Sequence, residues 1–326
     1  MPSLLRRTLL SACLGAAALA CGPVLADDAY PGKPIRVVVP YTPGGVSDTV
    51  TRLLMTRLGE RLKTPIVVEN MGGANGQIGS AVVARSAPDG HTLLVVVAAH
   101  AINPSLYPKM TYSPLQDLRG VSQFGGIPLL MVSSAQLPPT NLKEFVAWAK
   151  ANPQKATYAS SGAGSGAHLV AELFAQTTGA PMTHIPYKGI APALPDLFSG
   201  QVAAIFDSVQ TMLPQVKAGK LRALAMTSAQ RWPAAPEVPT MAESGYPGMT
   251  GGSWIGLLAP ARTPSAIVHR LSAEMQAVVN APDIHARLIE YGIDPVGGTP
   301  EQFDSFIQGE ARRWAEVIKK ANIRLE

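Results

Sequence analysis

The sequence predicts an α/β protein with two lobes, and three observations support this class. Apolar residues make up 47% and charged residues 15% of the 326 positions, so the chain can bury a large core. Short β-branched runs alternate with helical spacings, which is typical of βαβ units. The fully apolar run Leu-Leu-Val-Val-Val, at 93–97, is typical of a parallel strand covered on both faces.

The first lobe is predicted to begin with this alternation. β-branched residues indicate a strand at 35–39, and apolar residues at helical spacing indicate a helix at 48–62. The same patterns predict further elements in chain order, namely a strand at 66–69, a helix at 78–85 and a strand at 92–97. His100 and Asn103, which come next, are expected to build a turn; the alternative is that they contact a ligand.

A second lobe is predicted from a new run that starts with Pro-Leu-Leu-Met-Val-Ser-Ser at 128–134. Its expected elements are a helix at 142–151, a strand at 157–160, a helix at about 167–178, and strands at 184–186, 202–207 and 221–227. The Pro- and Gly-rich stretch 232–252 has neither period, so we expect a long connection there.

The end of the chain is predicted to return to the first lobe. It should form a strand at 254–258, with Trp254 in the core, and helices at 265–280 and 300–321. The chain would cross over near Gly125-Gly126 and return near Gly251-Gly252. The predicted organisation is a signal peptide at 1–26, lobe 1 at 27–125 plus 252–326, and lobe 2 at 126–251.

The first 26 residues have the pattern of a secretory signal. Arg6 and Arg7 precede an apolar run at 9–20, and Val-Leu-Ala at 24–26 forms a small-residue cleavage site. No later apolar run reaches the roughly 20 residues that span a bilayer, so we expect an exported, periplasmic protein. Two alternatives remain, namely lipid attachment at Cys21 and twin-arginine export.

Removal of this segment changes what the chain can do chemically. Both cysteines, Cys13 and Cys21, lie in it, so the mature form would have no disulfide and no thiolate chemistry. The segment also carries two of the 27 basic side chains, which leaves 25 basic against 22 acidic ones. A net charge of +3, without a basic run, gives no indication of nucleic-acid binding.

Enzyme motifs are largely missing, so we expect no catalysis, no cofactor and no metal. The sequence has no G-x-S-x-G, H-E-x-x-H or P-loop motif, and its six histidines are scattered singly. One stretch, from Gly162 to Ala167, fits the dinucleotide pattern G-x-G-x-x-A. The acidic residue that should follow is missing from 181–189, but a secreted oxidoreductase or hydrolase remains a rival interpretation.

Two glycine-rich turns share a different feature. At 43–48 and again at 160–168, a strand ends, glycines follow, and a helix begins with small polar residues. Free amides in a first helical turn, together with the helix dipole, can bind an anion without a basic side chain. Asp48 need not repel that anion if it caps its own helix. The alternative is that such turns bind nothing.

The motifs resemble, in order, a known family. They are PYTPGGVSD, VEN with GGANGQIG, HAINPSLY, YASSGAGSGAHL, PYKG, GKLRALAMTS with VPT, and WIGLLAP. This set is similar to the Bug receptors, the periplasmic solute-binding proteins of tripartite tricarboxylate transporters. The resemblance covers essentially the whole mature chain. It implies a two-lobed periplasmic binding protein fold, type II-like, with the ligand in the interlobe cleft.

The resemblance also implies a function. The protein would capture a small organic carboxylate, either a di- or tricarboxylate or an aromatic acid, and deliver it as a monomer to membrane permease subunits. A ligand-sensing role for a signalling system would use the same binding site. Binding data cannot separate the two roles, because both bind the same acids. The loops also do not indicate which acid is bound, because they hold the shared carboxylate.

Ligand-binding residues are carried over from the family one by one. The first loop contributes Tyr41, Pro43, Gly44, Gly45, Ser47 and Asp48, and the second contributes Ser160, Ser161, Gly162, Gly164, Ser165 and His168. Tyr187 and Asp207 are added around the middle or far end of the ligand. The alternatives are that His168 only closes its helix and that Asp207 is a solvated charge. Tyr41, where the family often has Phe, and Met71-Gly72 depart from the pattern.

Overall fold

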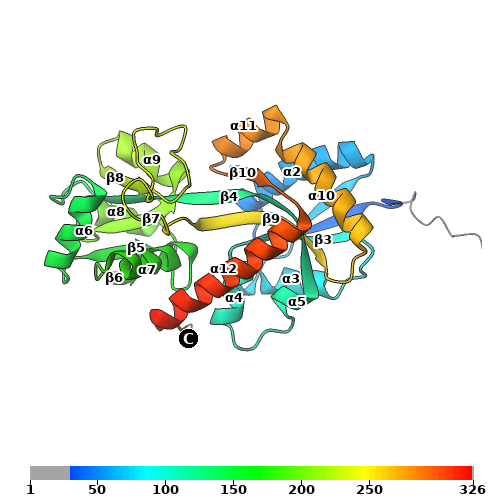
Figure 1. Ribbon diagram of the computed structural model, residues 1–326, viewed down its shortest axis with the longest axis horizontal. Coiled ribbons are helices and arrows are strands. Elements are labelled where there is room, and N and C mark those ends of the chain that lie inside the picture. The colour runs from blue at the N-terminus through cyan, green and yellow to red at the C-terminus, as the bar shows by residue number, and fades with distance from the viewer. Residues whose placement is uncertain (1–29, 325–326) are drawn as a thin grey trace, which may run out of the picture.

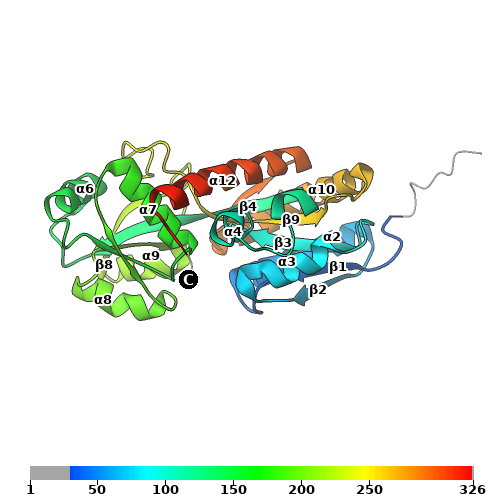
Figure 2. The ribbon, with the colours of Figure 1, turned by 90° about the horizontal axis from the view of Figure 1, so that it is seen from below.

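The computed structural model describes residues 30–324, so the predicted signal peptide lies outside the described residues. One mixed ten-stranded sheet runs through the molecule in the order β2-β1-β3-β9-β4-β7-β5-β6, with β10 and β8 also paired to β4. Helices cover the sheet in two halves, and β4 and β9 run between them (Figures 1 and 2).

The N-terminal elements build one half of the sheet. They are β1 (Ile35–Val39), α2 (Val46–Leu62), β2 (Ile66–Asn70), the short η1 (Ala74–Gly76), α3 (Gln77–Ala84), β3 (Thr92–Val97), α4 (Ala99–Leu106) and α5 (Pro114–Asp117). β1 pairs in parallel with both β2 and β3. β1 and β3 are largely buried on both faces, as their apolar runs predicted.

The strand β4 (Leu118–Ser134) belongs to both halves. Its first part pairs with β9 and β10, and its last part pairs with β7 and β8. All three pairings that join β3, β9, β4 and β7 are antiparallel, so a purely parallel sheet is the wrong description. The sequence analysis found only residues 128–134 of this strand, because the glycines and polar residues before Pro128 interrupt the apolar pattern.

The elements of the second half, and those that lead the chain back to the first half, follow in chain order. They are α6 (Leu142–Ala151), β5 (Thr157–Ser160), α7 (Gly166–Thr178), β6 (Thr183–Pro186), η2 (Ala191–Ala193), α8 (Leu194–Ser199), β7 (Ala204–Ser208), α9 (Val209–Lys217), β8 (Leu221–Met226), β9 (Gly252–Pro260), α10 (Ser265–Val279), α11 (Pro282–Glu290), β10 (Asp294–Gly297) and α12 (Pro300–Lys320). The stretch between β8 and β9 is the predicted long connection. The division into lobes stays a prediction.

Several short elements were not predicted. The turn expected at His100 and Asn103 is the helix α4, although Pro104 lies inside it. Pro214 similarly lies inside α9, and α11 buries only Ile284 and Leu288. Such helices are formed by tertiary packing, because their own spacing or composition gives a weak signal.

The last helix, α12, connects the two halves (Figure 1). Trp314 and Val317 on this helix pack in one buried cluster with Leu169 and Phe174 of α7. The Gln176 side chain also donates a hydrogen bond to the Val317 carbonyl at 3.3 Å. Movement of one half against the other must therefore keep or break this contact.

Two adjacent glycines on β4 provide a test of this packing. A β-carbon on Gly125 would lie 2.4 Å from the Asp294 carbonyl oxygen, whereas one on Gly126 would have no neighbour within 4 Å. We expect Gly125→Ala to lower the free energy of unfolding by about 1–3 kcal/mol, because β10 must move away from β4. Gly126→Ala should change it by less than about 0.5 kcal/mol. If urea denaturation gave the same loss of stability for both variants, the close packing of β10 against Gly125 would not matter for stability.

Candidate functional site

The register of the strands brings both glycine-rich loops toward the middle of β4. Ile255 of β9 pairs with both Val97, the last residue of β3, and Gly125 of β4. From the other half, Ser208 at the end of β7 pairs with Leu129 of β4. Because β1 is parallel to β3, and β5 and β6 to β7, the loops after these strands all face residues 125–129.

Asp48 organises the first loop from inside. Its side chain is only 5% exposed, and one carboxylate oxygen accepts the Gly44 amide at 2.9 Å. The other oxygen accepts Arg52 Nε and Asn70 Nδ2, both at 3.0 Å. Burial by itself raises the pKa of Asp48, but these hydrogen bonds outweigh it and hold the pKa below its ordinary value.

This arrangement leaves the start of α2 uncapped. Gly45 is the N-cap residue, and no side chain bonds the amides of the first turn. The first helical bond runs from the Thr49 amide to the Gly45 carbonyl at 2.9 Å. The sequence allowed Asp48 to cap its own helix, but its side chain instead accepts the Gly44 amide just before the helix. The amides of Val46 and Ser47 therefore remain available in this part of the described chain.

The first loop also borders a hollow that the site prediction did not include. Tyr41 and Pro43 line it together with Asn70, Gly73 and Asn75, among others. Asn75 has a positive φ of 52°, and its side chain donates to Asn103 Oδ1 at 2.8 Å. The motifs that contain these asparagines were noticed as family signatures, but nothing in them indicated a place next to the first loop.

The second loop is closed by its own side chains. Ser165 caps α7 by accepting the His168 amide at 3.3 Å, and His168 Nδ1 accepts the Gly164 amide at 2.9 Å. Ser160 Oγ accepts the Gly162 amide at 3.1 Å. His168 thus closes the first turn of its helix. Ser161 is exposed, and no hydrogen bond uses its hydroxyl among the contacts of residues 30–324.

Tyr187 and Asp207 lie at the ends of β6 and β7. The Tyr187 hydroxyl donates to Asp196 at 2.5 Å; burial and this carboxylate together raise the pKa of Tyr187 to about 12. Asp207 is half-buried and accepts the Ser208 amide at 2.7 Å. Burial raises the pKa of Asp207, and no salt bridge to it exists within residues 30–324. A fully solvated charge is therefore the wrong description of Asp207.

The predicted site residues form two groups rather than one. One group surrounds the start of α2, and the other lies at the ends of β5, β6 and β7. No hydrogen bond or salt bridge within the described chain links a residue of the first group to one of the second. The hydrogen bonds of each group stay within its own half of the molecule, and both groups face the middle of β4.

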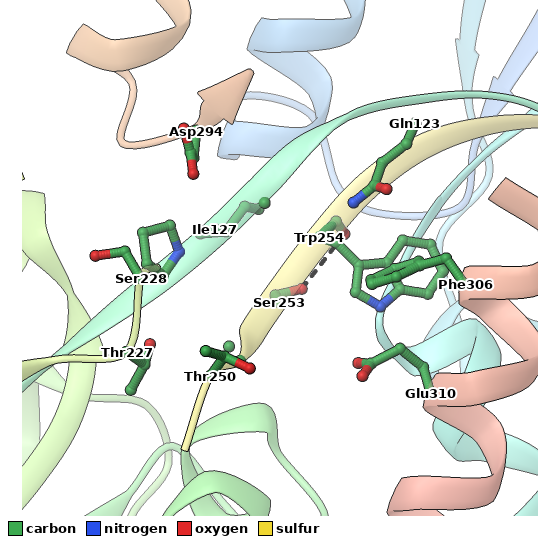
Figure 3. A pocket seen from close by; sticks show the side chains of 14 residues that line it. Gln123, Ile127, Thr227, Ser228, Thr250, Ser253, Trp254, Asp294, Phe306 and Glu310 are labelled. Carbon is green, nitrogen blue, oxygen red and sulfur yellow. Dashed lines mark hydrogen bonds between the residues drawn. The ribbon is translucent and has the colours of Figure 1, made fainter. Parts of the chain in front are cut away.

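Between them, β4 and β9 border a hollow shown in Figure 3. The Thr227 hydroxyl accepts the Leu129 amide at 2.8 Å and fixes the returning chain to β4. Trp254 is 2% exposed and lies edge-on to Phe303 and Phe306, so its predicted core position is confirmed. These residues escaped the site prediction because only the strand register reveals that they meet.

The Asp48 network leads to a prediction for stability. We expect Asp48→Asn to lower the free energy of unfolding at pH 7 by about 1–3 kcal/mol, because charge-assisted hydrogen bonds are lost. The pKa of Asp48 is lowered on folding, so its contribution is present above pH 3.8 and disappears as the pH falls below that value. As the pH falls below 3.8, the difference in free energy of unfolding between Asp48→Asn and the wild type, measured by urea denaturation, should therefore become smaller.

Asp283→Asn is the matched control, because its carboxylate forms an exposed ion pair with Arg57. It should cost less than about 1 kcal/mol. An Asp48→Asn protein as stable at pH 7 as this control would contradict the proposed role of the network.

Within residues 30–324, no helix is both long and apolar enough to cross a membrane. In the same residues, no three His, Cys, Asp or Glu side chains gather as a metal-binding group.

Comparison with known proteins identifies the family. The model of the tripartite tricarboxylate transporter family receptor matches residues 50–323. BugT of Bordetella pertussis is 39% identical over 306 residues, which are 93% of this chain and 94% of BugT. An R. palustris protein solved with adipate is 36% identical, with a TM-score of 0.75, and covers 91% of this chain and 100% of its own.

A second solved structure agrees. MatC from Rhodopseudomonas palustris with bound malate is 34% identical, with a TM-score of 0.69, over 89% of this chain and 100% of MatC. These structures confirm the predicted α/β periplasmic binding protein fold. The chain belongs to the tripartite tricarboxylate transporter receptor family, whose members are periplasmic solute-binding proteins.

Proposed function

We propose that this receptor binds a small dicarboxylate between two lobes, 27–125 plus 252–326 and 126–251, and presents it to membrane permease subunits. The observation that carries the proposal is the uncapped start of α2, which faces the same part of β4 as the second loop. An anion placed there receives main-chain hydrogen bonds and the favourable end of the helix dipole.

The free energies favour closure of the lobes over the ligand. A hydrogen bond to a charged group contributes about 1.5–3 kcal/mol, so four such bonds give roughly 6–12 kcal/mol. Association costs about 4–15 kcal/mol, which can consume all of this. Micromolar binding, near −8 kcal/mol, therefore needs both loops on one ligand and the exclusion of water.

Relatives with adipate and malate support a dicarboxylate of four to six carbons as the ligand. Such an acid can place one carboxylate on each loop. The backbone amides of both loops suit the two carboxylates that such acids share. The middle of the ligand's carbon chain would contact Tyr187 and Asp207. Tricarboxylates and aromatic acids belong in the same ligand panel as comparisons.

The remaining parts of the proposal concern export, oligomeric state and the absence of catalysis. Export through the signal at 1–26 would place the mature chain in the periplasm as a monomeric, non-catalytic receptor. Calorimetric titration of the purified mature protein with adipate, malate, citrate and benzoate tests the binding proposal. Micromolar binding of at least one dicarboxylate is expected, and no heat with any of these acids would contradict it.

A matched pair of glycine substitutions tests the backbone mechanism. Gly44 and Gly219 both have positive φ, 83° and 70°, and a β-carbon on either would have no neighbour within 4 Å. Valine at either position should cost about 1–2 kcal/mol of stability through backbone strain. Only Gly44→Val should weaken adipate or malate binding, at least roughly tenfold, because its side chain blocks the approach to the amides.

Lys188→Ala is a second control, since this exposed lysine stands next to Tyr187. Its removal should change the dissociation constant less than about threefold, because charge on an exposed lysine is well screened. A large loss with Lys188→Ala and none with Gly44→Val would show that a cationic side chain, rather than the backbone, holds the acid.

A further inference from the structure

Behind the second loop, four buried or partly buried side chains from three elements form a cluster. The rings of His168 on α7 and His184 on β6 are stacked, with centroids 3.8 Å apart and planes 13° from parallel. Tyr158 of β5 stacks on His184 at 4.9 Å and donates its hydroxyl to Glu172 at 2.5 Å. In the sequence these histidines are sixteen positions apart, so they were taken as isolated.

The hydrogen bonds of this cluster fix both glycine amides of the loop. The Gly164 amide donates to His168 Nδ1, so that nitrogen carries no proton. The Gly162 amide donates to Ser160 Oγ, which lies 2.6 Å from His184 Nε2. His184 therefore supports the loop twice, through the Ser160 hydroxyl and through its stack on His168.

The bond from the Gly164 amide requires a neutral His168 ring. His168 in its neutral form has its proton on Nε2, 4.0 Å from Glu172 Oε1. A second proton would have to go to Nδ1, where it would displace the Gly164 amide. Burial, and then the neighbouring His184, lower the pKa of His168 to about 4; burial also lowers the pKa of His184. The other titratable groups that face the stack are Glu172 of α7 and Tyr158 of β5.

We propose that His184 is a positioning residue for the second loop: it keeps the Gly162 and Gly164 amides in their internal hydrogen bonds, and so fixes the shape of the loop that receives a ligand carboxylate. The inference rests on the proposed function and deepens it, because His184 lies behind the loop and touches no ligand. Proton uptake by the stacked pair then loosens the loop, so the receptor is acid-sensitive at this position.

The first experiment compares two substitutions of His184 at pH 7.5, with adipate and malate as probes. His184→Phe keeps a stacking ring but loses the bond to Ser160, and we expect a roughly tenfold higher dissociation constant, as for one lost hydrogen bond. His184→Gln keeps a polar group at the position of Nε2 and should recover most of that loss. His269→Gln, an exposed histidine on α10, is the matched control and should bind like the wild type.

The second experiment needs no ligand. In ligand-free protein, the amide signals of Gly162 and Gly164 should shift together with the histidine pair, at a midpoint below pH 6.5. Because His184 lowers the pKa of His168, His184→Gln should raise the midpoint that the Gly164 amide reports. A residue with only a general structural role would not move this midpoint.

The outcomes separate the two proposals. Equal affinities for His184→Phe and His184→Gln, or a Gly164 midpoint unmoved by His184→Gln, would overturn the positioning role. If neither acid binds the wild type, the proposed function fails, and the amide titration alone still decides the role of His184. Thermal unfolding of each variant confirms that the protein is folded.

Discussion

The shared strand β4 is the constraint on which the rest of the structure depends. Its first part pairs with β9 and β10 and its last part with β7 and β8, so a single strand sets the register of both halves. The strands that precede the two glycine-rich loops, β1 and β5, then run toward residues 125–129 from opposite directions. The two glycine-rich loops are aligned by backbone hydrogen bonds, before any of their own side chains act.

The two glycine-rich loops are held in shape by different groups. The first loop keeps its helix amides free, because Asp48 is occupied by Gly44, Arg52 and Asn70. The second loop uses Ser165 and His168 to hold its own amides, and so it depends on the neutral histidines behind it. One loop is held by a charge and the other by uncharged rings, and added protons weaken both.

Much of the fold could be predicted from the sequence, because its strands carry continuous apolar runs. The bounds at 35–39, 92–97, 142–151 and 157–160 agree with the structure. The first part of β4 could not be found, since Gly120, Ser122 and Gly125 remove the apolar pattern. The loops of the site were found through their glycines. The pairs Asn75–Asn103 and His168–His184 were not, because only the tertiary fold brings them together.

The central claim is that main-chain amides, rather than cationic side chains, hold the acid. A crystal structure of the adipate complex tests it most directly. The account predicts one carboxylate about 2.7–3.1 Å from the amide nitrogens at the start of α2, and the other against the loop from Ser161 to Gly164. A carboxylate held by a lysine or arginine side chain, or an acid bound in the hollow beside Trp254, would contradict it.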